Sequence, residues 1–158
     1  MQEKDLIIKM YSLYRKSELS PVKLITGSNV KHIFTTNRFL DDLTIFEKIN
    51  SKKLGFDVYP AFRGDDVLNV EAPFFLELVN KINVSSLDEL EKAVEKKIDE
   101  FISAGCRATD ISLAGVLPIA DKKDACKVFA KRIKGKPLTE EDIKVYKGYM
   151  SYSLLKLF

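Results

Sequence analysis

The stretch YPAFRGDDVLN, residues 59–69, runs from an apolar segment directly into an arginine, a glycine and two aspartates. Its apolar part belongs to FDVYPAF, residues 56–62, which is rich in aromatic and β-branched residues and has the length of a strand. A strand that ends in charged residues predicts a loop at the edge of a sheet. Either this loop binds a ligand, or Arg63 and Asp65 form an ion pair that only stabilises a turn.

Two further candidate strands precede and follow this one in the chain. They are VKHIFTTN, residues 30–37, and CRATDISLAG, residues 106–115. The segments between these strands show the apolar spacing of helices, in FLDDLTIFEKINSKK at 39–53 and in SSLDELEKAVEKKIDEFISAG at 85–105. Connections of this length suit parallel strands, which need a crossover of about a dozen residues or more. We therefore predict an α/β fold with a sheet of about three parallel strands and flanking helices.

Local signals mark the ends of several predicted helices. Ser86 and Glu89 fit a capping box at the start of the long helix, and Gly105 ends it. The apolar stripe of this helix comprises Leu87, Leu90, Val94, Ile98, Phe101 and Ile102. Ser20 and Pro21 are typical of the N-cap and first position of another helix. The remaining predicted helices cover 2–16, 20–28, 121–135 and the segment from Pro137 towards the C-terminus.

Length and composition favour one soluble domain. With 158 residues, 46% of them hydrophobic, we expect a single α/β domain, with a helical lead-in over 1–28 and three β/α units over 29–158. The 26 basic and 23 acidic residues nearly balance, so neither nucleic acid nor a membrane is predicted as a partner. Cys106 and Cys126 lack metal-ligand spacing, and no cofactor or metal is predicted. Without an apolar leader or spanning segment, a cytoplasmic location is expected.

Ligand sites of α/β sheets lie beyond the carboxyl ends of the strands. The residues that end the predicted strands are therefore the candidate site, namely Thr35, Thr36, Asn37, Phe62, Arg63, Asp65, Thr109, Asp110 and Ser112. Asp110 could equally cap a turn. His32 is the single histidine, and we expect it to be structural because it lies in or just before the first strand.

Three segments in this order resemble the uronate (glucuronate) isomerases, TIM-barrel members of the amidohydrolase superfamily. The family patterns TTD(D)P, (F/W)RPDxxxN and HGCRxSDH correspond to FTTNR at 34–38, FRGDDVLN at 62–69 and AGCRATDIS at 104–112. KGKPLTEEDIKVYKGYM at 134–150 is also similar to a helix of the family, and the resemblance begins at about residue 21. It implies a TIM-barrel-like sheet and a sugar-acid ligand. The substrate-binding residues it implies are Thr36, Asn37, Arg63, Asp65, Asn69 and Asp110.

The chain departs from the family pattern in extent and in detail. A complete barrel needs roughly 250 residues. The family's His-x-His pair, its later histidine and its tryptophan have no counterpart in a chain with one histidine and no tryptophan. Gly64 replaces a proline, which is expected to loosen the loop. Asn37 and Arg38 replace carboxylates, and Ile111 replaces a histidine.

The reaction of this family interconverts glucuronate or galacturonate with the corresponding keto-uronates. It requires a group that moves a proton between adjacent carbons and a cation that holds the sugar carboxylate. Arg63 suits the second task, because a planar guanidinium can bind a carboxylate through two hydrogen bonds. No matched residue suits the first task, so no catalytic residue is assigned. We expect no activity from the chain alone.

Three interpretations of the function remain open. The chain is a divergent or truncated isomerase segment that acts with a complementary chain, a non-catalytic sugar-acid-binding module, or a structural protein that self-associates. Parallel sheets are normally buried on both faces, and three strands alone leave exposed edges. We therefore expect a partner, either a second copy in a homo-oligomer or a complementary chain.

Overall fold

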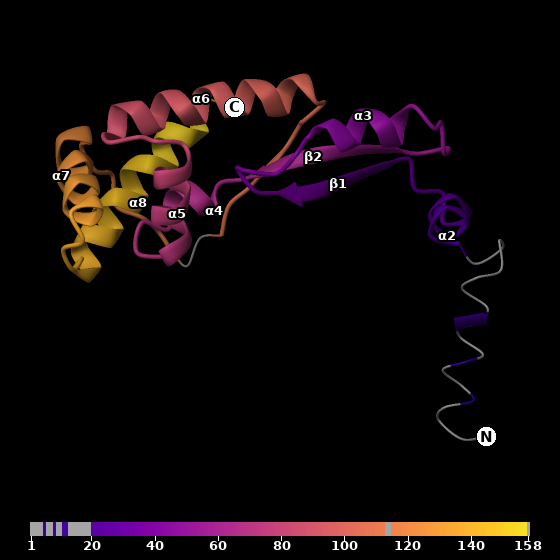
Figure 1. Cartoon of the computed structure of the whole chain (residues 1–158), viewed down its shortest axis with the longest axis horizontal. Helices are drawn as coiled ribbons and strands as arrows, with labels where there is room; N and C mark the ends of the chain where they lie inside the picture. The colour runs from indigo at the N-terminus through magenta and orange to yellow at the C-terminus, as the bar shows by residue number, and fades with distance from the viewer. Residues whose placement is uncertain (1–4, 6–7, 9–10, 13–19, 113–114, 158) are drawn as a thin grey trace.

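The computed structural model describes residues 5, 8, 11–12, 20–112 and 115–157, and its centre is a parallel sheet. The strand order is β1–β2–β3, with β1 at His32–Asn37, β2 at Asp57–Arg63 and β3 at Thr109–Asp110 (Figure 1). The flanking helices are α2 (Pro21–Gly27), α3 (Thr44–Asn50), α4 (Asp65–Leu68), α5 (Pro73–Lys81), α6 (Leu87–Ser103), α7 (Lys122–Ile133) and α8 (Glu140–Leu155). The predicted α/β fold is confirmed. In these ranges no helix is long and apolar enough to cross a membrane.

The predicted helix over 2–16 lies largely outside the described residues. The helix predicted to follow it is confirmed as α2, where the Ser20 hydroxyl accepts a hydrogen bond from the backbone N–H of Lys23 at 3.4 Å. A serine oxygen in this position satisfies one of the donors that a helix start leaves free. Pro21 occupies the first turn, as expected.

The third strand is much shorter than its sequence predicts. β1 pairs with β2 over all six of its residues, whereas β3 pairs only with Phe62 and Arg63, the last two residues of β2. The chain leaves β2 at Arg63 and turns into α4, so β3 reaches its neighbour only at the very end. Of the predicted strand over 106–115, the described residues form a two-residue ladder beside the carboxyl end of the sheet, and residues 113–114 lie outside the described part of the chain.

The helix after β1 also begins later than its periodicity predicts. α3 begins at Thr44, although apolar spacing predicts a helix over 39–53. The Asp42 carboxylate accepts hydrogen bonds at 2.9 Å from both the backbone N–H and the hydroxyl of Thr44. The backbone N–H of Arg38 donates to Asp41 at 2.9 Å. Because aspartate side chains offer the backbone these local partners, the segment before Thr44 forms turns in place of helix.

The long helix α6 buries most of its predicted apolar stripe but forms only one of the two hydrogen bonds of the predicted capping box. The Ser86 hydroxyl accepts from the N–H of Glu89 at 3.2 Å, whereas the Glu89 carboxylate accepts from the N–H of Ser85 at 2.7 Å. The predicted stripe is buried as far as Phe101, but Ile102 is exposed. Phe101 takes the last place facing the core, so the prediction for Ile102 was wrong.

Helices α3 and α6 lie on the same face of the sheet (Figure 1). Phe46 of α3 packs with Val58, and the ring of Phe101 meets that of Phe62 edge-on, with centroids 5.1 Å apart. Val58 and Phe62 are four residues apart on β2, so both point to one face. The larger core continues from Phe62 into the group of helices α4 to α8. The carboxyl end of the sheet therefore leads directly into the helical part of the molecule.

A glycine in α8 allows another segment to cross that helix at close range. A Cβ atom on Gly148 would lie 2.1 Å from the carbonyl oxygen of Pro118. No real side chain fits at that distance, so the helix and the backbone at Pro118 would have to separate. The absence of a side chain at Gly148 thus allows the backbone at Pro118 to lie directly against α8.

We expect Gly148→Ala to destabilise the fold by about 1–3 kcal/mol, the usual cost of overpacking. In an open helix the same change would stabilise by roughly 1 kcal/mol. Gly27→Ala is the matched control, because nothing lies within 4 Å of a Cβ atom at that helical position. Urea denaturation of both variants measures the difference. Equal stability of the wild type and Gly148→Ala would contradict the close approach.

The start of α8 is fixed by a capping box and by an ion pair to α7. The Thr139 hydroxyl accepts from the N–H of Asp142 at 3.1 Å, and the Asp142 carboxylate accepts from the N–H of Thr139 at 2.7 Å. The Lys131 ammonium of α7 donates to the same carboxylate at 2.5 Å. Lys131, followed by the hydrogen bonds from Thr139, lowers the pKa of Asp142 to about 2.

This lowered pKa predicts a loss of stability in acid. The Asp142 pKa is about 3.9 in an unfolded chain, so its carboxylate stabilises the fold fully above that pH. The contribution is lost as the pH falls from about 3.9 through about 2. Denaturation midpoints from pH 6 to pH 2 should therefore fall less for Asp142→Asn than for the wild type. Asp99→Asn, at an exposed position of α6, is the control and should follow the wild type. Parallel curves for all three proteins would contradict the prediction.

Candidate functional site

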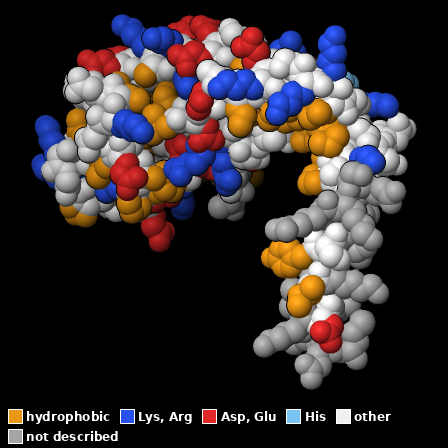
Figure 2. All heavy atoms as spheres, turned by 45° about the vertical axis from the view of Figure 1, so that its right-hand side comes forward, with side chains coloured by type: hydrophobic (Ala, Val, Ile, Leu, Met, Phe, Trp, Pro, Cys, Tyr) orange, Lys and Arg blue, Asp and Glu red, His pale blue; other side chains and the backbone are white. Residues whose placement is uncertain are grey.

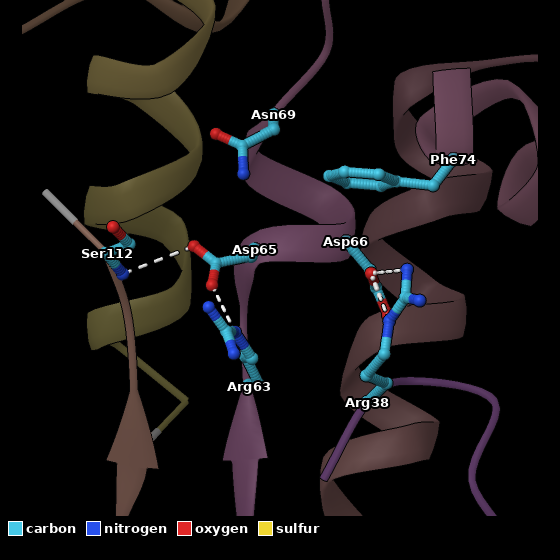
Figure 3. Close-up of a pocket in the computed structure, with 7 residues that line it drawn as sticks. All are labelled: Arg38, Arg63, Asp65, Asp66, Asn69, Phe74 and Ser112. Carbon is cyan, nitrogen blue, oxygen red and sulfur yellow. Dashed lines mark hydrogen bonds and ion pairs between the residues drawn. The ribbon is translucent and has the colours of Figure 1, made fainter. Parts of the chain in front are cut away.

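The charged loop after β2 forms one wall of a hollow at the carboxyl end of the sheet. β2 ends at Arg63, and α4 begins two residues later at Asp65. The hollow has a volume of about 350 Å³, and the loops after all three strands contribute to it (Figure 3). Its lining residues are Arg38, Arg63, Asp65, Asp66, Asn69, Phe74 and Ser112.

Arg63 and Asp65 form an ion pair at the end of β2. The Arg63 Nε–H donates to Asp65 Oδ2, while Asp65 Oδ1 accepts from the backbone N–H of Ser112 at 3.2 Å. The Asp65 side chain is only 9% exposed, but that of Arg63 is 45% exposed. Hydrogen bonding to Asp65 raises the pKa of Arg63 above its usual value. The turn-stabilising ion pair that the sequence allows is therefore present, and it also holds Arg63 in a fixed position at the hollow.

A second arginine is held in the same way by the next aspartate. Arg38 donates to Asp66 through Nε at 3.0 Å and through Nη2 at 2.5 Å, and Asp66 also accepts from the N–H of Phe39 at 3.2 Å. The Asp66 side chain is 8% exposed. The Arg38 guanidinium lies 5.3 Å from the centroid of the Phe74 ring, a cation–π contact.

Sequence reasoning did not assign Arg38, Asp66 or Phe74 to the site. A usable signal was the pair of opposite charges in neighbouring loops, Arg38 after β1 and Asp66 after β2. Parallel neighbours bring such loops to the same edge of a sheet. Phe74 carries no comparable signal, because an aromatic residue in an apolar helix reads as core.

The six residues predicted to bind substrate fall into three groups. Arg63, Asp65 and Asn69 line the hollow. Thr36 and Asp110 lie on the same face of the sheet as Arg63, where the Thr36 hydroxyl donates to Asp110 at 3.4 Å, but they do not line it. The side chain of Asn37 points to the opposite face, because it directly follows Thr36 in the strand. There it donates to Asp41 at 3.3 Å and accepts from the Thr35 hydroxyl at 2.7 Å.

Gly64 has a backbone conformation that a proline could also adopt. Its φ is −76° and its ψ is −7°, so no left-handed conformation requires a glycine there. Its N–H donates to the carbonyl oxygen of Asp110 at 3.0 Å, a bond that a proline cannot make. A Cβ atom on Gly64 would lie 3.2 Å from Leu154 and 3.3 Å from Ile111. Glycine therefore adds a link between β2 and β3 and makes room for these two side chains.

His32 lies at the other end of the sheet. It is the first residue of β1, and its Nδ1 atom lies 3.8 Å from Asp57. Five residues of strand separate it from the carboxyl end of β1, about 16 Å at 3.3 Å per residue. Among the described residues, no group of three or more histidine, cysteine, aspartate or glutamate side chains is placed to hold a metal ion. The residues that line the hollow offer hydrogen-bond donors and acceptors and one aromatic surface.

Comparison with known proteins places this geometry in a family. The family model for glucuronate isomerase matches residues 3–158. The uronate isomerase of Caldanaerobacter subterraneus subsp. tengcongensis is 35% identical over 152 residues, which cover 90% of this chain and 32% of that protein. The uronate isomerase of Caldicellulosiruptor saccharolyticus is 32% identical over 149 residues, covering 89% of this chain and 32% of that protein. The chain thus spans about a third of the length of these relatives.

Solved structures show the same relationship in three dimensions. The crystal structure of the Thermotoga maritima uronate isomerase matches with a TM-score of 0.82 and 27% identity, covering 89% of this chain and 33% of that one. The glucuronate isomerase of Caulobacter crescentus, at 20% identity, shares the fold with a TM-score of 0.79 over 94% of this chain and 32% of its own. The predicted resemblance of the sheet to these structures is confirmed, and the chain belongs to the glucuronate isomerase family.

Proposed function

We propose that this chain provides the sugar-acid-binding part of a uronate isomerase site and does not isomerise a sugar acid by itself. One observation carries the proposal. The partly exposed guanidinium of Arg63 is fixed by the buried Asp65 beside a hollow at the carboxyl end of the sheet. Relatives that are named uronate isomerase supply the class of ligand. The hollow lies within the size range of small-molecule sites, which is about 300–1,000 Å³.

The lining residues suit the parts of a sugar acid. A guanidinium has five N–H donors, and Asp65 accepts from Nε, so the terminal nitrogens of Arg63 can bind a ligand carboxylate. Asn69 supplies both a donor and an acceptor for sugar hydroxyl groups. The ring of Phe74 offers an apolar surface on the other side of the hollow (Figure 3).

The same residues lack a carrier for the proton that an isomerase must move. Asp65 and Asp66 each accept hydrogen bonds from an arginine and from a backbone N–H, so neither carboxylate is free to approach a substrate carbon. His32 is about 16 Å away along β1. Among the residues that line the hollow, we therefore assign ligand binding to Arg63 and Asn69 and proton transfer to none. Activity would need residues from outside this chain.

Calorimetry with glucuronate tests the binding half of the proposal. We expect the wild type to bind and Arg63→Gln to lose about ten- to a hundredfold in affinity, since hydrogen bonds to charged groups contribute about 1.5–3 kcal/mol. Arg107→Gln is the matched control, because Arg107 is an exposed arginine just before β3 that does not line the hollow. Equal affinity in Arg63→Gln and the wild type would leave Arg63 a structural role only.

Turnover is measured separately, by following glucuronate with NMR in the presence of the purified chain. We expect no keto-uronate to form, because the hollow has no proton carrier. Production of keto-uronate by the wild type would refute the second half of the proposal and leave the binding half intact.

A further inference from the structure

One face of the sheet is covered by helices and the other is open. Helices α3 and α6 pack on the face to which Val58 and Phe62 point. The opposite face carries His32, Phe34 and Thr36 of β1 and their register partners Asp57, Tyr59 and Ala61 of β2. Figure 1 shows both helices on one side of the strands, and no described helix lies across the other. Figure 2 shows hydrophobic side chains gathered on the surface at the sheet end of the molecule.

The open face has an apolar centre between paired polar groups. The rings of Phe34 and Tyr59 lie side by side, with centroids 5.6 Å apart, and Phe34 is 50% exposed. Towards one end, His32 faces Asp57, and towards the other, Thr36 donates to Asp110. The polar groups therefore have partners within the face, while the aromatic surface remains in contact with solvent. Parallel sheets are normally buried on both faces.

The outer edge of β1 is open as well. In the described sheet β1 pairs only with β2, so the backbone groups along its other edge have no strand beside them. An unpaired edge next to an exposed aromatic face is a ready template for another strand. The two features adjoin, so one partner can cover both.

We propose that this surface, the open face around Phe34 and Tyr59 together with the outer edge of β1, is the docking site for a polypeptide that supplies further β/α units of the glucuronate isomerase family. The match to the Thermotoga maritima uronate isomerase covers 33% of that chain, so about two thirds of the relative lies outside the match. A strand from such units pairs in parallel with β1, as β2 does, and the units close over the aromatic face. This inference rests on the family and the open sheet, and is independent of sugar-acid binding.

A second copy of the chain fits this surface less well. Closed dimers are related by a two-fold axis. If the axis is perpendicular to the sheet, the two β1 strands pair antiparallel. If the axis runs along the strands, they pair in parallel but the two open faces point to opposite sides. A second copy therefore cannot extend the parallel sheet and cover the face at the same time. A partner with its own parallel strands can do both.

The test uses the 158-residue chain and a designed partner. The partner is the Caldanaerobacter uronate isomerase in which the matched segment is replaced by a flexible Gly/Ser linker. The two chains are co-expressed, and complexes are isolated through a tag on the partner. We expect a 1:1 complex by light scattering. We also expect at least tenfold slower hydrogen exchange of backbone amides in β1 than in the chain alone.

Two variants at positions of similar exposure locate the contact. Phe34→Glu places a charge on the open face, and Ile45→Glu places the same charge on the covered side, on α3, where Ile45 is 52% exposed. Phe34→Glu should weaken the complex at least tenfold and Ile45→Glu should not. Thermal unfolding of each chain alone confirms that both variants fold.

Three results would overturn the proposal. One is a partner that stays insoluble or uncomplexed when the chain is present, and another is equal binding by both variants. The third is a stable dimer of the chain alone that Phe34→Glu dissolves, because the face would then belong to a second copy. No sugar acid enters these measurements, so their failure leaves the binding proposal untouched.

Discussion

Two adjacent buried aspartates hold the carboxyl end of this sheet together. Asp65 binds Arg63 at the end of β2 and the backbone of Ser112 beyond β3. Asp66 binds Arg38 and the backbone of Phe39 beyond β1. A buried carboxylate is costly unless it is paired and hydrogen-bonded, so each aspartate requires its neighbours to stay in place. The hollow exists because these two side chains diverge from consecutive positions and reach the loops of both neighbouring strands.

The sequence predicted the architecture more fully than its details, for identifiable reasons. Periodicity and crossover length identified three parallel strands and the order of the helices. They could not show that β3 would shrink to two residues, because its length depends on where β2 turns away. Apolar periodicity also predicted too early a start for α3. The Asp41 and Asp42 side chains accept hydrogen bonds from nearby backbone N–H groups, and these bonds compete with helix formation. Ile102 was assigned to the core because helical spacing alone does not show which of two neighbouring residues faces inward.

The candidate site shows a similar division. Arg63, Asp65 and Asn69 could be placed at the hollow because they follow a strand and match a family motif in register. Asn37 also ends a strand and stands at a position of the family motif, although it replaces a carboxylate there; alternation along β1 turns it to the other face, where it binds Asp41. Arg38 and Asp66 were missed because each is placed at the hollow by its ion pair with the other, and this pair forms only between two separate loops. Position relative to a strand is thus readable from sequence, whereas pairing between loops requires the assembled sheet.

The contact around Gly64 makes one departure from the family pattern difficult to reverse. A proline at this position would remove the N–H that binds Asp110, and its ring would press on Ile111 and Leu154. Ile111 itself stands where the family pattern has a histidine. A proline at position 64 would therefore require Ile111 and Leu154 to move and the hydrogen bond to Asp110 to be lost. The tight contact thus couples position 64 to position 111, because a side chain at the first fits only if the second gives way.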